Sequence, residues 1–186
     1  MSSADPERVS QSLELPHTRF TRAVDGALDR VGRAVSWIWL LLLVVIVSNV
    51  TLRYAFGAGR IEFEELQWHL YSVGFLTGLS YCMQADAHVR VDVLRERLEP
   101  RMQAWIELYG ILLLVLPFAA LILIFGVPFV VDSFQSGERS PSPGGLPYRW
   151  LIKSALPAGF ALLALAAVSR ILRVCAFLFG PEKSGS

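Results

Sequence analysis

The chain has 186 residues, 54% of them hydrophobic, and its mean hydropathy is +0.48. Soluble domains contain about 45–50% apolar residues, so this composition indicates an integral membrane protein. The formal net charge of +1 offers no basic face for nucleic acid, and we expect no nucleic-acid partner.

Four apolar stretches are each close to the ~20 residues that a helix needs to cross the hydrocarbon core of a bilayer. They predict an all-α integral membrane protein with transmembrane helices at about 35–56, 65–84, 105–131 and 148–174. In this prediction, residues 1–33 form a cytoplasmic N-terminal tail, 34–175 the four-helix membrane domain, and 176–186 a cytoplasmic C-terminal tail.

The first predicted span contains the run LLLLVVIV, which favours insertion into a membrane. Trp37 and Tyr54 are ~26 Å apart along a helix, which is the spacing of two interfacial aromatic belts. A cleaved signal peptide is the alternative. We favour an uncleaved span, because the preceding tail is long and partly acidic and the apolar run exceeds a typical signal sequence.

The distribution of arginine predicts the orientation, because cytoplasmic loops are enriched in Lys and Arg. Nine arginines lie in the N-terminal tail and the second loop, against four in the first and third loops. Both termini are therefore expected in the cytoplasm, with the first and third loops outside.

Three carboxylates, Glu62, Glu64 and Glu65, lie where the second span begins. Carboxylates in the first turn of a helix gain ~0.3–1 kcal/mol each from the positive end of the helix dipole. One interpretation is therefore helix capping with local pairing to Arg53 and Arg60. The other is contact with a partner protein.

His69 is the candidate ionisable group inside a span, four residues after Glu65 on the same helical face. Two ligands do not make a metal site, so we expect His69 to bond within its own helix, and we expect no metal or other cofactor. The pairs Gly74/Gly78 and Ala155/Gly159 have a spacing that lets helices approach closely.

The second loop contains apolar residues at helical spacing, with arginines off this stripe. It predicts an amphipathic helix in the inner membrane interface, which breaks and restarts at Pro100. A solvated charged loop is the alternative. The third loop is rich in proline and glycine and is expected to consist of turns.

Two further features concern the third and fourth spans. Pro117 and Pro128 predict that the third span tilts or kinks. Lys153, in the opening turns of the fourth span, can extend its ammonium group to the interface, so its charge does not indicate an ion path.

Short motifs occur in a characteristic order: Arg53-Tyr54 at the end of the first span, Glu64-Glu65-Leu66 at the start of the second, and HVRVD at 88–92. Together they resemble the small, DctQ-type membrane subunit of tripartite ATP-independent periplasmic (TRAP) transporters, over about residues 30–175. The stretch GGLPYRW at 144–150 is similar to one branch of that family. Phe63 stands where a Trp is usual, which keeps an aromatic anchor.

The resemblance implies a subunit of the bacterial inner membrane that binds a larger, DctM-type permease subunit. A periplasmic solute-binding protein would deliver an organic acid, and the large subunit would hold the substrate and Na⁺ sites. The small subunit would act as a scaffold, with no catalytic residue. The residues expected to serve the partner interface or the structure are Arg53, Tyr54, Glu64, Glu65, Gly74, Gly78, His88, Val91 and Asp92, with Gly144, Gly145 and Pro147 in the periplasmic loop.

Two alternatives of other classes remain open. A b-type cytochrome needs pairs of facing histidines, and only His69 lies in a span, which leaves at most a haem-less anchor subunit of a redox complex. A free-standing small transporter or channel is disfavoured by the scarcity of charges in the spans. An enzyme would need a polar constellation that the sequence does not contain.

Overall fold

The computed structural model describes residues 15, 16, 18–85 and 98–180, and this part of the chain is helical with no strand. This confirms the all-helical class. The elements are α1 (Arg19–Phe56), α2 (Ile61–Gln84), α4 (Pro100–Gly110), the π-helical segment η2 (Ile111–Val115), α5 (Leu116–Gln135) and α6 (Arg149–Phe179). The amphipathic helix predicted in the second loop falls mostly on residues 86–97, outside the described residues.

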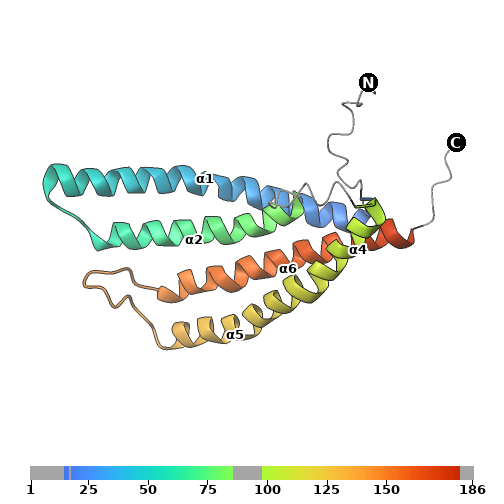
Figure 1. Cartoon of the computed structure of the whole chain (residues 1–186). Coiled ribbons are helices and arrows are strands. Elements are labelled where there is room, and N and C mark those ends of the chain that lie inside the picture. Colours follow the sequence, from blue (N-terminus) through green and yellow to red (C-terminus); the bar gives the residue numbers. More distant parts are fainter. Residues whose placement is uncertain (1–14, 17, 86–97, 181–186) are drawn as a thin grey trace, which may run out of the picture.

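The helices lie side by side in the order α1, α2, α6, α5, so that α2 and α6 form the inner pair (Figure 1). At one end of the bundle, Leu15 and Ala104 pack against Val174 and Leu178 of α6. We call this the terminal end. The connections 57–60 and 136–148 lie at the opposite end, which we call the loop end (Figure 1).

α1 begins well before the predicted span, inside the segment that the sequence assigned to a tail. Thr18 and Thr21 form a capping box: the Thr18 hydroxyl accepts from the Thr21 N–H at 3.2 Å, and the Thr21 hydroxyl accepts from the Thr18 N–H at 2.9 Å. Val24 and Leu28 then pack against Ala166 of α6. At 38 residues, α1 is about 57 Å long, more than the ~30 Å hydrocarbon core requires.

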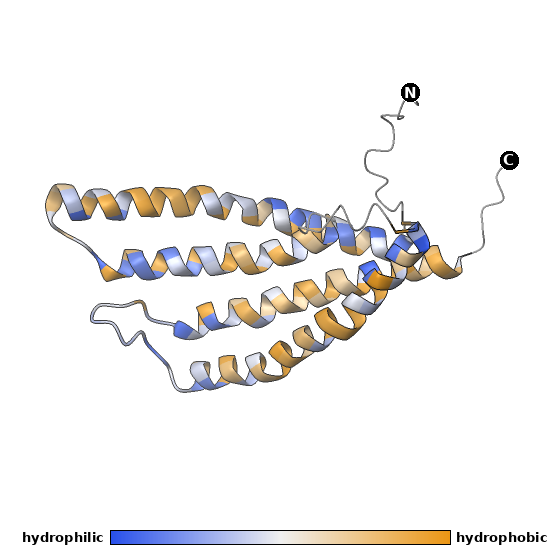
Figure 2. Cartoon of the chain, in the orientation of Figure 1, coloured by the Kyte–Doolittle hydropathy of each residue, from blue (hydrophilic) through white to orange (hydrophobic). Residues whose placement is uncertain are grey.

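Three helical stretches of the described chain are long and apolar enough to cross a membrane: Arg19–Phe56, Pro100–Gln135 and Arg149–Phe179. α2, predicted as the second span over 65–84, does not reach this level. Figure 2 shows the reason, since polar and apolar residues alternate along α2, whereas α5 is hydrophobic over most of its length.

The three apolar stretches keep most of their hydrophobic side chains on the outside of the bundle. Only 17% to 33% of the residues in their most apolar windows are buried. On α5, for example, Leu121, Ile124 and Phe125 are between 50% and 69% exposed. A contiguous apolar surface of this kind is unfavourable in water and favourable against lipid or a partner protein.

The proline positions explain the course of the third predicted span. Pro100 occupies the first turn of α4, which confirms the expected helix start there. The π-helical turn η2 comes just before Pro117, and the Leu116 N–H donates to the Ile111 carbonyl, five residues back. Because proline lacks an N–H and clashes with the preceding turn, the irregular hydrogen bonding occurs at η2, where the helix curves (Figure 1).

Gly159 holds α6 close to α2, and a Cβ there would lie 2.7 Å from the Leu76 Cβ and 3.3 Å from its backbone. We expect Gly159→Leu to lower the free energy of unfolding by about 1–3 kcal/mol relative to Gly78→Leu, because a Cβ at Gly78 meets no atom within 4 Å. Both changes gain helix propensity equally, so that gain cancels. Unfolding of the two variants in detergent measures the difference, and equal stability would contradict the close approach.

Candidate functional site

The carboxylates at the start of α2 make contacts within the chain. Glu64 forms an ion pair with Arg53 of α1, and the two side chains are 41% and 50% exposed. No side-chain hydrogen bond caps α2, whose N-cap residue is Arg60. For Glu64 the structure therefore shows local pairing. Since exposed pairs contribute about 0–1 kcal/mol, this pair adds little stability.

Glu65 joins α2 to the loop formed by residues 136–148. One carboxylate oxygen accepts from the Leu146 N–H at 2.6 Å, and the other accepts from the Ser140 hydroxyl. Gly145 lies against both groups: a Cβ there would be 2.8 Å from the Glu65 oxygen and 2.5 Å from Ser140. The single carboxylate of Glu65 thus holds the loop on the end of the bundle, and only glycine fits beside it.

The loop itself consists of turns, as the sequence predicted. Gly144 has a φ of 80°, in the left-handed region that glycine adopts at low cost. The Gly145 N–H donates to the Ser142 carbonyl at 2.9 Å. Pro147 directly follows Leu146, whose N–H binds Glu65. Gly144, Gly145 and Pro147 therefore lie together in one folded loop at the loop end.

A second carboxylate, Glu138, closes the other side of this loop. It accepts from the Lys153 ammonium and from the Ser133 hydroxyl at 2.7 Å, and Arg149 lies 3.4 Å away. The hydrogen bond from Lys153, followed by that from Ser133, lowers the pKa of the Glu138 carboxyl below its ordinary value. Lys153 is 15% exposed and its ammonium lies 3.9 Å from the Phe129 ring centroid, so it is paired within the chain instead of reaching to solvent.

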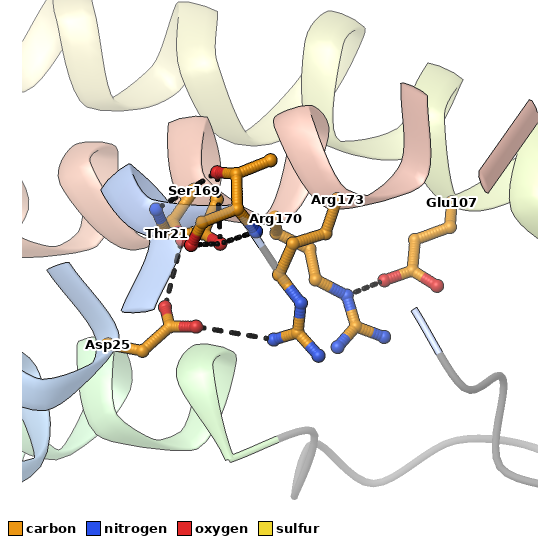
Figure 3. A network of polar contacts seen from close by, with 7 residues as sticks. Thr21, Asp25, Glu107, Ser169, Arg170 and Arg173 are labelled. Atoms are coloured by element: carbon orange, nitrogen blue, oxygen red, sulfur yellow. Dashed lines mark hydrogen bonds and ion pairs between the residues drawn. The ribbon is translucent and has the colours of Figure 1, made fainter. Parts of the chain in front are cut away.

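At the terminal end, a polar network joins three helices (Figure 3). Asp25 of α1 accepts from the Ser169 hydroxyl at 2.8 Å and lies 3.5 Å from Arg173. Arg170, on the same helix α6, donates to the carboxylate of Glu107 in α4. The network therefore connects the N-terminal part of α1 and the C-terminal part of α4 to the last turns of α6.

Sequence reasoning missed this network, because among the ionisable groups of the predicted spans it considered only His69 and Lys153. Arg170 is 4% exposed and Asp25 is 8% exposed. Charges so deeply buried are normally paired. The available signal was a pair of arginines three residues apart near the end of the fourth span, with Glu107 near the start of the third.

His69 bonds to its own helix, as predicted, through Nδ1 and the Glu65 carbonyl oxygen. Among the described residues, no three His, Cys, Asp or Glu side chains come together as a metal site. Gly74 lies against Trp39 of α1, with a would-be Cβ 3.1 Å from its ring, whereas Gly78 faces open space. Tyr54 is 82% exposed.

The predicted site residues therefore lie in different parts of the structure. Arg53 with Glu64, and Glu65 with the loop glycines, gather at the loop end. Gly74 lies further along α2, in its contact with α1. The remaining predicted residues, His88, Val91 and Asp92, lie outside the described residues.

Comparison with known families gives one match. Residues 42–176 match the family described as "Tripartite ATP-independent periplasmic transporters, DctQ component". No curated protein and no solved structure matches the chain. The matched range contains the three loop-end carboxylates Glu64, Glu65 and Glu138, and the Glu107–Arg170 pair. It covers α2, α4 and α5 in full, most of α6, and α1 from Leu42 onward. The chain belongs to the DctQ family, the small membrane component of TRAP transporters.

Proposed function

We propose that this chain is the scaffold for a DctM-type large permease subunit in Na⁺-coupled, binding-protein-dependent uptake of an organic acid. The observation that carries the proposal is the charge distribution along the helices. Residues 34–52, 66–84, 108–131 and 154–169 contain no Asp, Glu, Lys or Arg. Because ionisable residues inside a membrane usually mark an ion or substrate path, transport sites are expected on the partner.

The charges at both ends of the helices support the same role. At the loop end, Glu64, Glu65 and Glu138 each bind a group of this chain, and at the terminal end Glu107 pairs with Arg170. These contacts connect α2, α4 and α6, and the bond between Asp25 and Ser169 adds α1. A transport domain that moves during the cycle needs a rigid neighbour that stays fixed.

We further propose that the chain crosses the inner membrane of a bacterium four times. α1, the α4–α5 stretch and α6 are each apolar enough to span, and both α1 and α4 begin at the terminal end (Figure 1). α2 must therefore return across the same thickness, and its 24 residues span about 36 Å. The inner position of α2, between α1 and α6, shields part of its polar surface from lipid.

The expected topology has both termini in the cytoplasm and the loop end in the periplasm, following the nine-to-four distribution of arginines. Reporters fused after Ser186 and before Met1 should report a cytoplasmic location. Reporters inserted near Gly57 and Gly144 should report a periplasmic location. A reporter that is exported when fused to the C-terminus would contradict four crossings.

The partner proposal is tested by affinity purification of the tagged chain from membranes of its native host in mild detergent. We expect a multi-span permease to co-purify in a fixed ratio. Recovery of the chain alone, monodisperse and active in transport, would instead support a free-standing transporter. The loop at 136–148, fixed on α2 by Glu65, is the surface that we propose for the periplasmic binding protein.

A further inference from the structure

A groove with a volume of about 310 Å³ lies between α1 and α2, in the half of the bundle nearer the terminal end. The two helices are in close contact on either side of it. A Cβ on Gly32 would lie 2.5 Å from the Tyr81 ring, and a Cβ on Gly74 would lie 3.1 Å from the Trp39 ring. Between these contacts, a Cβ on Gly78 would meet no atom within 4 Å, so the groove is open over this glycine.

The groove begins at the level where the hydrocarbon of a membrane is expected to end. Arg33, which lines it, is the last charged residue before the charge-free stretch 34–52 of α1. Trp37, 70% exposed, follows four residues later, and Tyr81 lies in the last turn of α2. Basic and aromatic residues are typical of the interface between lipid and water. From Arg33 to Trp39 the groove therefore extends about 9 Å along α1, from the interface toward the hydrocarbon core.

The groove below the guanidinium of Arg33 offers no free hydroxyl group. The Ser36 hydroxyl donates to the Arg33 carbonyl of its own helix at 2.7 Å. The Thr77 hydroxyl donates to the Val73 carbonyl, also within its own helix and at 2.7 Å. The remaining lining consists of glycines, a valine and aromatic rings. An acyl chain can therefore occupy the groove without leaving either hydroxyl unsatisfied.

Arg33 gives the mouth of the groove a positive charge. Its side chain is 70% exposed and forms an ion pair with Asp29 at 2.8 Å. Because a guanidinium has five N–H donors, this pair leaves donors for a second acceptor. Arg30, exposed and one turn away on α1, adds a further positive charge. Two arginines against one aspartate leave the mouth with a net positive charge, which is complementary to an anionic headgroup.

We propose that this groove binds one phospholipid, with an acyl chain over Gly78 and the headgroup phosphate at Arg33. Phospholipids place a phosphate at this depth, and a guanidinium binds phosphate with paired hydrogen bonds. A headgroup with a net negative charge is preferred, because arginines near the surface attract anionic lipid. The groove between α1 and α2 at the loop end lacks this complementarity, since Arg53 and Glu64 in its lining pair with each other.

Native mass spectrometry of the full chain, purified in mild detergent and titrated with phosphatidylglycerol, tests the groove. We expect one lipid to bind at a lower concentration than any other. Gly78→Leu should abolish this binding and leave the fold intact, because its side chain enters open space. Gly110→Leu is the matched control, since a Cβ there also meets no atom within 4 Å, and this variant should keep the lipid. Equal lipid binding by the two variants would overturn the inference.

Substitution of Arg33 tests the headgroup contact. Arg33→Gln should weaken binding of phosphatidylglycerol by about fivefold, and binding of phosphatidylcholine by less. Arg22→Gln should weaken neither, because Arg22 is exposed and lies about 16 Å further from the membrane along α1, beyond the range of screened charges. Inorganic phosphate should not displace the lipid. Displacement by phosphate, or equal effects of the two variants, would contradict a lipid headgroup at Arg33.

The same glycine variants distinguish a lipid from a protein in the groove. Gly78→Leu would release a co-purifying large subunit, or dissociate a dimer of this chain, if the groove were a protein interface. Either result, with lipid binding unchanged, would overturn the inference and leave the scaffold function standing. Failure of the large subunit to co-purify with the unmodified chain would contradict the scaffold function but not the lipid site, which requires only that the chain crosses the membrane.

Discussion

Replacing Glu107 with leucine is expected to lower the free energy of unfolding by about 3–5 kcal/mol, because it removes the carboxylate that accepts from the buried Arg170 guanidinium. The two side chains are 11% and 5% exposed, so solvent screens the pair only weakly. The loss is a large fraction of the stability of a typical domain, which is about 5–15 kcal/mol. Unfolding of the purified chain in detergent, monitored by circular dichroism, measures it.

The double variant Glu107→Leu with Arg170→Met is the decisive control. Removing both charges and keeping the volume apolar should recover most of the loss, since a buried pair and a hydrophobic replacement are often similar in stability. If the double variant were as unstable as the sum of the two single variants, the two residues would not act as a pair.

Replacing Glu65 with leucine is expected to have an effect of similar size, because it removes the acceptor of two hydrogen bonds at once. Hydrogen bonds to charged groups contribute about 1.5–3 kcal/mol each, and the Leu146 N–H and the Ser140 hydroxyl would both lose their partner. The connection 136–148 should detach from α2. Hydrogen exchange of the Leu146 amide is the direct readout, and it should become much faster.

The adjacent carboxylate provides the matched control for this prediction. Glu64→Leu should change stability by at most about 1 kcal/mol and leave exchange at Leu146 unaltered, because its pair with Arg53 is half exposed. Glu65→Gln should lie between the two, since an amide oxygen still accepts. Equal effects of Glu64→Leu and Glu65→Leu would contradict the assignment of Glu65 to the loop.

The apolar runs predicted the helical class, and three of the four expected spans reappear as long apolar helices. Local patterns also predicted the helix start at Pro100, the bond of His69 to its own helix and the turns after Gln135. These features depend on neighbouring residues in the chain, so a window of sequence contains the information that determines them. The short motifs identified the family, which the match over 42–176 confirms.

Features that depend on contacts between distant helices were not predictable from the same patterns. The bond from Glu65 to Leu146 joins residues that are 81 positions apart, and that between Asp25 and Ser169 joins residues 144 apart. The early start of α1 was missed because the hydropathy of residues 19–34 is that of a polar tail. The apolar residues Val24 and Leu28 in this segment are buried by α6, and this contact is visible only in the folded structure.

The central claim is that this chain supports transport without carrying it out. The most direct test is uptake into proteoliposomes that contain this chain alone, the large subunit alone, or both, with the periplasmic binding protein loaded with its own ligand outside. We expect uptake that depends on a Na⁺ gradient only when both membrane subunits are present. Uptake by vesicles that contain this chain alone would contradict the claim.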